Sequence, residues 1–458
     1  MPETENKKRG TRLKPAARKD VPEEANLYGD DADLPIRPRR AARVKKDRAA
    51  KREDSKTRAV RSAGRRASGK KKHRKRRRRA YRSLFELMSA TGSDSFFKPL
   101  RLFGREIRFW PLYLLGLIAL LAFGVMLNNS NLTVTEQKVT VVGLPEDLEQ
   151  YRIVVLSDMC GRRFGDNQSL LLRTVNALNY DAIFCVGDMV GRGGNAEPFL
   201  EFLDGLNHPD RVYFICGDSD PGPFVEAPRK ITGTLSQIVL EDWILGAIER
   251  GAHYVDAPMQ ITVKKSSLWV SPATMLNLET VSTVETWKDQ AAQEEDGVLA
   301  GLSADYNTLP MTDYRYQTMQ KLYEAQRTMA AGVIHISLAH ERPTNDFIYT
   351  SEAHNIATER YLPTPELILS GHYCNGVWRI PFVGAIYVPD ETMDRSGWLP
   401  EQALINGLSS VDDTQIYVTG GLSTNGAVRL MPFRLFNGPE ISVLTLTATL
   451  PENMLEAG

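Results

Sequence analysis

Three aspartates each follow an apolar run of the chain. The runs and their aspartates are 152–156 with Asp158, 181–186 with Asp188, and 211–216 with Asp218. Each run is rich in β-branched and aromatic residues and predicts a buried strand. The carboxyl ends of parallel strands meet at one edge of a sheet, where ligands commonly bind. Carboxylates gathered there repel each other unless a cation neutralises them. The pattern therefore predicts a metal site at this edge.

Imidazole and thiol groups follow two further apolar runs. The runs and their groups are 332–339 with His340, and 366–370 with His372 and Cys374. Another thiol, Cys160, stands two residues after Asp158. The two runs are further transitions from a predicted strand to polar residues that could belong to the same site.

The elements between the runs must bring their ends together. Apolar residues recur at helical spacing over 168–178 and again over 197–206, which predicts two helices. The order strand, helix, strand, helix, strand favours right-handed crossovers and an α/β fold. The chain has 458 residues, enough for one large domain with appendages. Its four cysteines are too few and too scattered for a disulfide framework.

The order of these motifs resembles that of the calcineurin-like metallophosphoesterases, most of all their membrane-associated bacterial branch. That family has a strand ending in Asp-x-His, then Gly-Asp-x-x-Asp, Gly-Asn-His-Asp/Glu, a lone His and Gly-His-x-His. The matching blocks begin at Asp158, Gly187, Gly217, His340 and Gly371. The resemblance covers residues 130–448 and implies a four-layer αββα sandwich with two divalent metals at the strand tips.

The resemblance also implies a set of metal ligands. They are Asp158, Cys160, Asp188, Asp218, His340, His372 and Cys374. The first metal would bind Asp158, Asp188, Cys160 and Cys374, and the second Asp188, Asp218, His340 and His372. Thiolates favour zinc or iron at the first site, whereas the harder second site suits Zn, Mn or Fe. The expected cofactor is therefore a pair of divalent ions, most readily Zn, Fe or Mn.

The chain departs from the family pattern within these blocks. The replacing residues are Cys160 and Cys374 for two histidines of the first metal, Gly191 for an aspartate, Asp218 for an asparagine, and Ser219 for a histidine. The three aspartates and two thiolates would lower the Lewis acidity of the metal pair. A Cys160–Cys374 disulfide is the alternative pairing, and it would abolish the first metal site.

Ser219 and Asp220 are catalytic candidates by the resemblance. Arg192 closely follows Asp188 and is a candidate to hold a phosphate oxygen, with a surface arginine as the alternative. Ser219 stands where the family has a histidine that assists phosphoryl transfer, and such a group is typically worth ~10²–10⁴-fold. We expect a metallophosphoesterase-type hydrolase in which metal-activated water attacks a phosphodiester or pyrophosphate. Its substrate would be a phosphorylated small molecule or an envelope or lipid-linked phosphate. The alternative is an impaired pseudoenzyme of the same fold that binds a ligand or partner.

The first eighty residues have a different character from the rest. Residues 1–80 hold about 30 Lys and Arg against about 11 Asp and Glu, although the whole chain has a net charge of only +1. Such a segment cannot bury enough apolar surface to fold alone and is expected to be disordered. Contact with anionic membrane lipid is the favoured interpretation. Nucleic-acid binding is the alternative, confined to this tail.

Residues 109–127 contain no charged residue. Their length is close to the ~20 residues that cross the hydrocarbon core of a membrane, and Trp110 and Tyr113 fit interfacial anchors. The sequence thus predicts a transmembrane helix between a juxtamembrane segment over 81–108 and the domain over 130–448. The Lys/Arg excess predicts a cytoplasmic N-terminus, an extracytoplasmic domain at the cell membrane, and a short tail over 449–458.

Overall fold

The computed structural model describes residues 100–102, 105–107, 110–226, 233–299, 309–329, 333–388, 397–424 and 434–448. The chain divides into two compact units, Met1–Ser93 and Asp94–Gly458, and every described residue belongs to the second. The predicted basic tail over 1–80 and the C-terminal tail over 449–458 lie outside the described residues. Most of the predicted juxtamembrane segment does so too.

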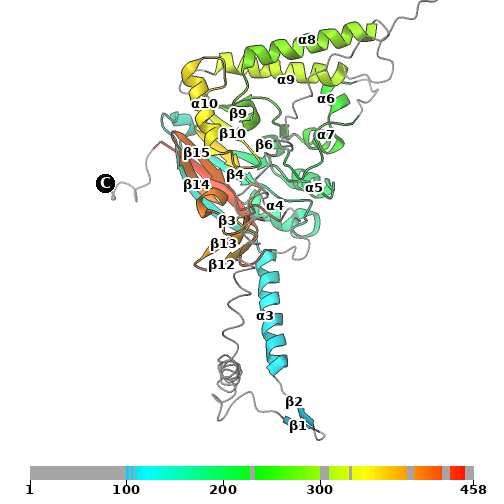
Figure 1. Cartoon of the computed structure of the whole chain (residues 1–458), viewed down its shortest axis with the longest axis vertical. Helices are drawn as coiled ribbons and strands as arrows, with labels where there is room; N and C mark the ends of the chain where they lie inside the picture. The colour runs from blue at the N-terminus through cyan, green and yellow to red at the C-terminus, as the bar shows by residue number, and fades with distance from the viewer. Residues whose placement is uncertain are drawn as a thin grey trace, which may run out of the picture. The chain divides into compact units, whose positions relative to one another are not determined.

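Two six-stranded sheets form the centre of the domain (Figure 1). The first sheet contains, in spatial order, β3 (Thr133–Thr140), β16 (Glu440–Thr447), β4 (Arg152–Leu156), β5 (Ala182–Val186), β6 (Val212–Ile215) and β7 (His253–Tyr254). The second contains β14 (Gly407–Val411), β15 (Thr414–Val418), β11 (Leu367–Ser370), β10 (Ile334–Leu338), β9 (Ser266–Pro272) and β8 (Met259–Val263). The three aspartate-bearing runs are β4, β5 and β6, and the two histidine-bearing runs are β10 and β11.

Both sheets are mixed, and each contains a run of four adjacent parallel strands. In the first, β4, β5, β6 and β7 are parallel, while β16 is antiparallel to β4 and parallel to β3. In the second, β9, β10, β11 and β15 are parallel, and β8 and β14 are antiparallel at the two edges. The parallel strands confirm the predicted α/β architecture. They place the ends of β4, β5 and β6 at one edge.

The helices lie between the strands in sequence. Their bounds are α3 (Trp110–Ser130), α4 (Ser169–Asn176), α5 (Glu197–Gly205), α6 (Leu235–Val239), α7 (Asp242–Glu249), α8 (Thr280–Leu299), α9 (Leu309–Thr328), α10 (Asn345–Ala357) and α11 (Gln402–Ile405). The helices predicted over 168–178 and 197–206 are α4, which is three residues shorter, and α5, which is one residue shorter. Two small hairpins, β1–β2 (Leu100–Leu102, Arg105–Ile107) and β12–β13 (Trp378–Ile380, Gly384–Tyr387), stand outside the large sheets.

Alternation along the strands produces an apolar cluster on each face of each sheet. Ile153 of β4 and Phe184 of β5 pack with Ile336 and Leu369 of the second sheet, so one cluster fills the space between the sheets. The opposite face of the first sheet packs against α4, α5 and α7, and that of the second packs against α9 and α10. Burying one such side chain stabilises the fold by about 1.5–3 kcal/mol. The layers are helix, sheet, sheet, helix, as the resemblance implies.

The apolar segment before the first sheet is helical, and α3 begins at Trp110 and ends at Ser130. In the described part of the chain, however, no helix was found to have the length and apolar character needed to cross a membrane. The transmembrane span over 109–127 stays a prediction from the sequence.

Candidate metal centre

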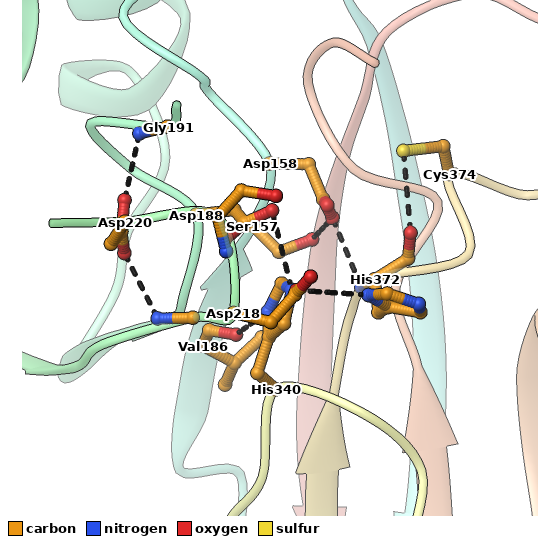
Figure 2. Close-up of polar contacts among 12 residues, drawn as sticks. Ser157, Asp158, Val186, Asp188, Gly191, Asp218, Asp220, His340, His372 and Cys374 are labelled. Atoms are coloured by element: carbon orange, nitrogen blue, oxygen red, sulfur yellow. Dashed lines mark hydrogen bonds and ion pairs between the residues drawn. The ribbon is translucent and has the colours of Figure 1, made fainter. Parts of the chain in front are cut away.

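Five of the predicted ligands come together where the two sheets present their strand ends (Figure 2). Asp158, Asp188 and Asp218 follow β4, β5 and β6 of the first sheet, and His340 and His372 follow β10 and β11 of the second. Main-chain hydrogen bonds join the loops at the strand ends of the two sheets. One example runs from Leu422 N–H to the Ser157 carbonyl (2.9 Å). The centre is thus built on rigid elements from both halves of the sandwich.

The backbone at the centre is held in an unusual conformation. The left-handed residues among the predicted ligands are Asp158 (φ 54°), Cys160 (φ 50°), Asp188 (φ 54°), His372 (φ 69°) and Cys374 (φ 50°). For residues other than glycine this region costs of order 1–3 kcal/mol each, and it persists where surrounding bonds impose it. Main-chain bonds from Asp158 N–H to the Gly187 carbonyl (3.1 Å) and from Cys160 N–H to the Asp188 carbonyl (2.8 Å) do so here. Strain of this kind is typical of functional sites.

One group of ligand atoms consists of Asp218, His340 and His372. Asp218 Oδ1 lies 2.8 Å from His340 Nε2 and 3.2 Å from His372 Nδ1. The two ring nitrogens are themselves 3.3 Å apart. The Asp218 side chain is 50% exposed, whereas each histidine is only 9% exposed. Asp218 therefore marks the side of the centre that faces solvent.

A second group consists of Asp158, Asp188 and His340, and both carboxylates are fully buried. Asp158 Oδ2 accepts hydrogen bonds from the Ser157 hydroxyl (2.5 Å) and from the His372 main-chain N–H (3.1 Å). Asp188 Oδ1 accepts one from the Ser219 N–H (2.8 Å), and Asp188 Oδ2 lies 3.4 Å from His340 Nε2. His340 thus belongs to both groups.

The ring of His340 is fixed by a main-chain carbonyl. Its Nδ1 lies 2.8 Å from the Val186 carbonyl oxygen, the last residue of β5. A hydrogen bond to this carbonyl uses the proton on Nδ1, so Nε2 is the ring atom that faces Asp188 and Asp218 and would bind a metal in its deprotonated form. Gly187 makes room for the ring, because a Cβ at this position would lie 2.5 Å from His340 Nδ1.

The charges of the centre depend on one another. Burial raises the pKa of Asp158, and the nearby His340 only partly opposes this effect. Burial would also raise the pKa of Asp218, but hydrogen bonds from His340 and His372 hold it well below its usual range. Burial would lower the pKa of both histidines, yet Asp188 and Asp218 raise the pKa of His340, and Asp218 raises that of His372. The nearby carboxylates thus favour the protonated, positively charged form of both histidines.

The donor set fits a metal ion. Asp158 Oδ1 and Asp188 Oδ2 are buried and accept no hydrogen bond among the described residues. An unpaired buried carboxylate oxygen is strongly unfavourable, and a bound cation removes that penalty. Oxygen and imidazole ligands of this kind suit Zn, Mn or Fe. Asp158, Asp188, Asp218, His340 and His372 would hold the metal.

The predicted thiolate ligands are placed differently. Neither Cys160 nor Cys374 belongs to either ligand group among the described residues. The Cys374 thiol lies 3.6 Å from the His372 carbonyl oxygen and donates to it (Figure 2). Burial, followed by the charges of Asp158 and Asp188, raises the pKa of the Cys160 thiol. Both cysteines are free, and the alternative disulfide between them is not formed.

Asp188 was predicted to bridge two metals, and this role stays a prediction. Its Oδ1 accepts a hydrogen bond from Ser219 N–H, and its Oδ2 lies 3.4 Å from His340 Nε2. His340 is the residue common to the two ligand groups.

The three catalytic candidates lie in distinct environments. Ser219 is 4% exposed, and its buried hydroxyl has no hydrogen-bond partner among the described residues. Asp220 accepts hydrogen bonds from the main-chain N–H groups of Val190 (2.8 Å), Gly191 (2.8 Å) and Gly217 (2.9 Å), so we assign it a positioning role. Arg192 is exposed on the turn that follows Asp188.

A buried arginine outside the motifs holds the loop that carries His372 and Cys374. Arg434 is 1% exposed and donates to the carbonyl oxygens of Cys374 (2.9 Å), Gly420 (2.7 Å) and Gly421 (2.6 Å). Asn437 donates to the same Cys374 oxygen at 2.7 Å and accepts from Arg434 at 3.0 Å. Nothing in the local sequence distinguishes Arg434 from a surface arginine, because its partners are far away along the chain.

A comparison with known protein families tests the resemblance that the motifs indicate. Residues 151–376 match the family model described as calcineurin-like phosphoesterase. The matched calcineurin-like phosphoesterase domain includes every ligand of both groups, and it supports the predicted superfamily. The membrane-associated branch and the altered ligand motifs stay predictions.

Two solved structures are similar to this chain. The phosphopantetheinyl hydrolase PptH from Mycobacterium tuberculosis is 10% identical, with a TM-score of 0.30 over 67% of this chain and 98% of PptH. The purple acid phosphatase PPD1 from yellow lupin (Lupinus luteus) seeds is 12% identical, with a TM-score of 0.25 over 59% of this chain and 44% of that phosphatase. At these TM-scores neither similarity carries an argument about the site. No curated protein matches the sequence.

Proposed function

We propose that this calcineurin-like phosphoesterase domain hydrolyses a phosphodiester or a pyrophosphate with two divalent metal ions. The domain family implies a metal-dependent phosphoester hydrolase in general. The observation that carries the finer proposal is the meeting of Asp158, Asp188, Asp218, His340 and His372 from five strand ends. Two of their buried carboxylate oxygens lack any hydrogen bond among the described residues, which is the feature a bound cation would satisfy.

The protein residues would act mainly by position and charge. A pair of divalent ions, when bound, supplies an activated water and a clamp for phosphoryl oxygens. Ser219 N–H holds Asp188, and the Val186 carbonyl orients His340, so the ligand atoms are set before substrate arrives. Substrate would enter beside Asp218, because this carboxylate is half exposed while Asp158 and Asp188 are fully buried.

The choice of substrate follows from the residue at position 219. A buried serine hydroxyl cannot supply a proton near neutral pH as a histidine can. The leaving group must therefore be stable as an anion, which favours a phosphoanhydride or an activated diester over an alkyl monoester. We therefore propose a phosphoanhydride or an activated diester as the class of substrate.

The test is hydrolysis by the purified full chain with added Mn²⁺ or Zn²⁺. Bis(p-nitrophenyl) phosphate, p-nitrophenyl phosphate and a nucleotide sugar with a pyrophosphate link would be compared. Asp188→Asn should reduce turnover by at least about 100-fold, because it removes a buried ligand charge. Asp166→Asn, which changes an exposed carboxylate after β4, is the matched control and should be neutral. Equal activity of the two variants would reject the proposed centre.

A second candidate is a pseudoenzyme that binds metal or ligand without turnover. It is favoured by Ser219, which stands where the resemblance implies a histidine and whose buried hydroxyl has no hydrogen-bond partner among the described residues. In this case metal analysis would find bound ions that Asp188→Asn removes, while all three substrates would stay intact.

The location of the protein is a separate proposal. We propose that α3 contacts a lipid surface, and seven large apolar side chains between Tyr113 and Phe123 support this, each 48–67% exposed. The cytoplasmic position of the basic tail and the extracytoplasmic position of the domain are predictions from the sequence. Flotation of the full chain with vesicles in a density gradient tests the lipid contact.

A further inference from the structure

A second apolar surface lies on the small sheet around β12–β13. Six large apolar side chains are exposed there: Ile380 (43%), Phe382 (fully), Val383 (61%), Trp398 (51%), Leu399 (59%) and Phe436 (53%). We call this set the hairpin surface. Soluble domains rarely expose large apolar side chains in such a group, and a surface of this kind marks an interaction site.

Hydrogen bonds hold the members of the hairpin surface together. On one side of the hairpin, Leu399 N–H donates to the Ile386 carbonyl at 2.9 Å. On the other side, Arg379 N–H donates to the Leu435 carbonyl at 3.0 Å, and Leu435 N–H donates to the Val377 carbonyl at 3.0 Å. The segments that carry Trp398, Leu399 and Phe436 are therefore bonded to the two edges of the hairpin.

Three of these side chains are displayed by strained backbone. Phe382 (φ 68°), Leu399 (φ 52°) and Phe436 (φ 50°) all adopt the left-handed region. This region is a genuine outlier for bulky residues, and it is retained mainly where function requires it. Exposure and strain at the same three positions indicate a surface built for contact.

Two aromatic rings contact one of the exposed side chains, Trp398. Trp398 is 4.9 Å from the Tyr387 ring and 6.4 Å from the Trp378 ring, measured between centroids. Tyrosine and tryptophan are enriched where proteins meet the headgroup region of a bilayer, because each has an apolar body and a polar tip. The composition of the hairpin surface therefore fits lipid better than it fits a polar protein partner.

The chain path connects the hairpin surface with α3. The helix ends at Ser130, and β3 begins three residues later at Thr133. Thr133 lines a polar cavity of about 380 Å³ together with Arg379, Phe436 and Glu440. The apolar helix thus joins the domain at the margin of the hairpin surface, so one lipid surface is within reach of both.

The same cavity reaches the end of the loop that carries His372 and Cys374. Asn375, which directly follows Cys374, is part of its lining, and so is Asn437, which donates to the Cys374 carbonyl. The loop that carries His372 and Cys374 is therefore next to the hairpin surface. A headgroup at that surface would lie beside the catalytic loop.

We infer that the hairpin surface docks onto a phospholipid bilayer and that the metal centre acts on phosphate groups at its headgroup layer. Docking onto the bilayer does not require turnover, whereas the action on headgroup phosphates rests on the proposed function. Phe382, Val383 and Leu399 enter the interface, Trp398 lies at headgroup depth, and the polar cavity receives part of the headgroup.

The test uses the full chain in vesicles of phosphatidylcholine and phosphatidylglycerol with and without brominated acyl chains. The fluorescence of Trp398 is obtained by subtracting the emission of the Trp398→Phe variant from that of the wild type. Brominated lipid should quench this emission, and Phe382→Asp with Val383→Asp should reduce the quenching by about twofold or more. Ile356→Asp, on α10 and 88% exposed, is the matched control and should leave it unchanged.

Different outcomes separate docking from catalysis. Quenching with no hydrolysis of any phosphate ester would support docking and reject the proposed function. Hydrolysis with Trp398 quenched only by a soluble agent such as acrylamide would reject docking. Protection of Trp398 that depends on protein concentration in lipid-free detergent would identify a second copy of the chain as the occupant, and it would also overturn the inference.

Discussion

His340 is the residue on which both ligand groups depend. Its Nε2 lies 2.8 Å from Asp218 Oδ1 and 3.4 Å from Asp188 Oδ2, while Cys374 points to a carbonyl oxygen. We predict that His340→Ala removes most of the bound metal and that Cys374→Ala removes little. Metal content after dialysis, measured by mass spectrometry of the full chain, checks this. Equal losses in the two variants would restore Cys374 as a ligand.

The difference between the histidines and the cysteines could not be derived from the sequence. Asp158, Asp188 and Asp218 were predictable as neighbours because parallel strands bring their carboxyl ends to one edge. The direction of the Cys374 side chain depends on a hydrogen bond from its thiol to the His372 carbonyl oxygen, which motif spacing does not encode. Spacing thus predicts which residues approach the centre, and local hydrogen bonds decide which of them face it.

Arg434 carries a buried charge whose partners are main-chain oxygens. Its bonds to Cys374, Gly420 and Gly421 join the ligand loop to the loop after β15. We predict that Arg434→Lys lowers the free energy of unfolding by about 3 kcal/mol, since lysine cannot reach all of these acceptors and leaves buried oxygens unpaired. Urea denaturation checks this value. The control, Arg163→Lys, alters a surface pair with Glu201 and should change stability little.

At the scale of elements, the strands were more predictable than the segments that link them. The apolar runs before Asp158, Asp188 and His340 became β4, β5 and β10, because their burial on both faces leaves continuous hydrophobic sequence. The hairpin β12–β13 carries no such run. It is set by bonds to residues 397–399 and 435, which are distant in sequence. Its exposed apolar residues were therefore not identified from the sequence.

A buried histidine couples β9 and β10. His335 Nε2 lies 2.8 Å from the Ser271 hydroxyl, and its Nδ1 lies 2.8 Å from the Pro363 carbonyl oxygen. Burial lowers the pKa of His335 to about 4 from its ordinary 6.5. Between these values the unfolded chain binds a proton that the folded chain does not, so stability falls as pH decreases from 6.5 to 4. The loss reaches about 3 kcal/mol at the lower end.

The measurement that checks this prediction is urea denaturation at pH 7 and pH 4.5. We expect the wild type to lose more stability than His335→Gln over this interval, because the variant lacks the titrating ring. His253→Gln replaces an exposed histidine and should follow the wild type. If the wild type and His335→Gln lose the same stability, His335 does not contribute to the acid sensitivity.

At the scale of the whole molecule, the candidate centre joins the two sheets. Asp158, Asp188 and Asp218 come from the first sheet, and His340 and His372 come from the second. Without a cation the buried Asp158 and Asp188 carboxylates repel each other. A cation between them attracts both carboxylates. A bound metal would therefore act as a link across the sandwich as well as a catalytic group.

We accordingly predict that removing metal destabilises both sheets together. Metal at about 1,000 times its dissociation constant stabilises the folded state by about 4 kcal/mol, and a chelator removes that contribution. Thermal unfolding of the full chain with and without EDTA should show a lower midpoint with EDTA. Hydrogen exchange should become faster in β4 and β5 and also in β10 and β11. His340→Ala should already have the lower midpoint and should not respond to EDTA. Faster exchange in only one sheet would contradict a link between them, and an equal EDTA response in wild type and His340→Ala would place the metal elsewhere.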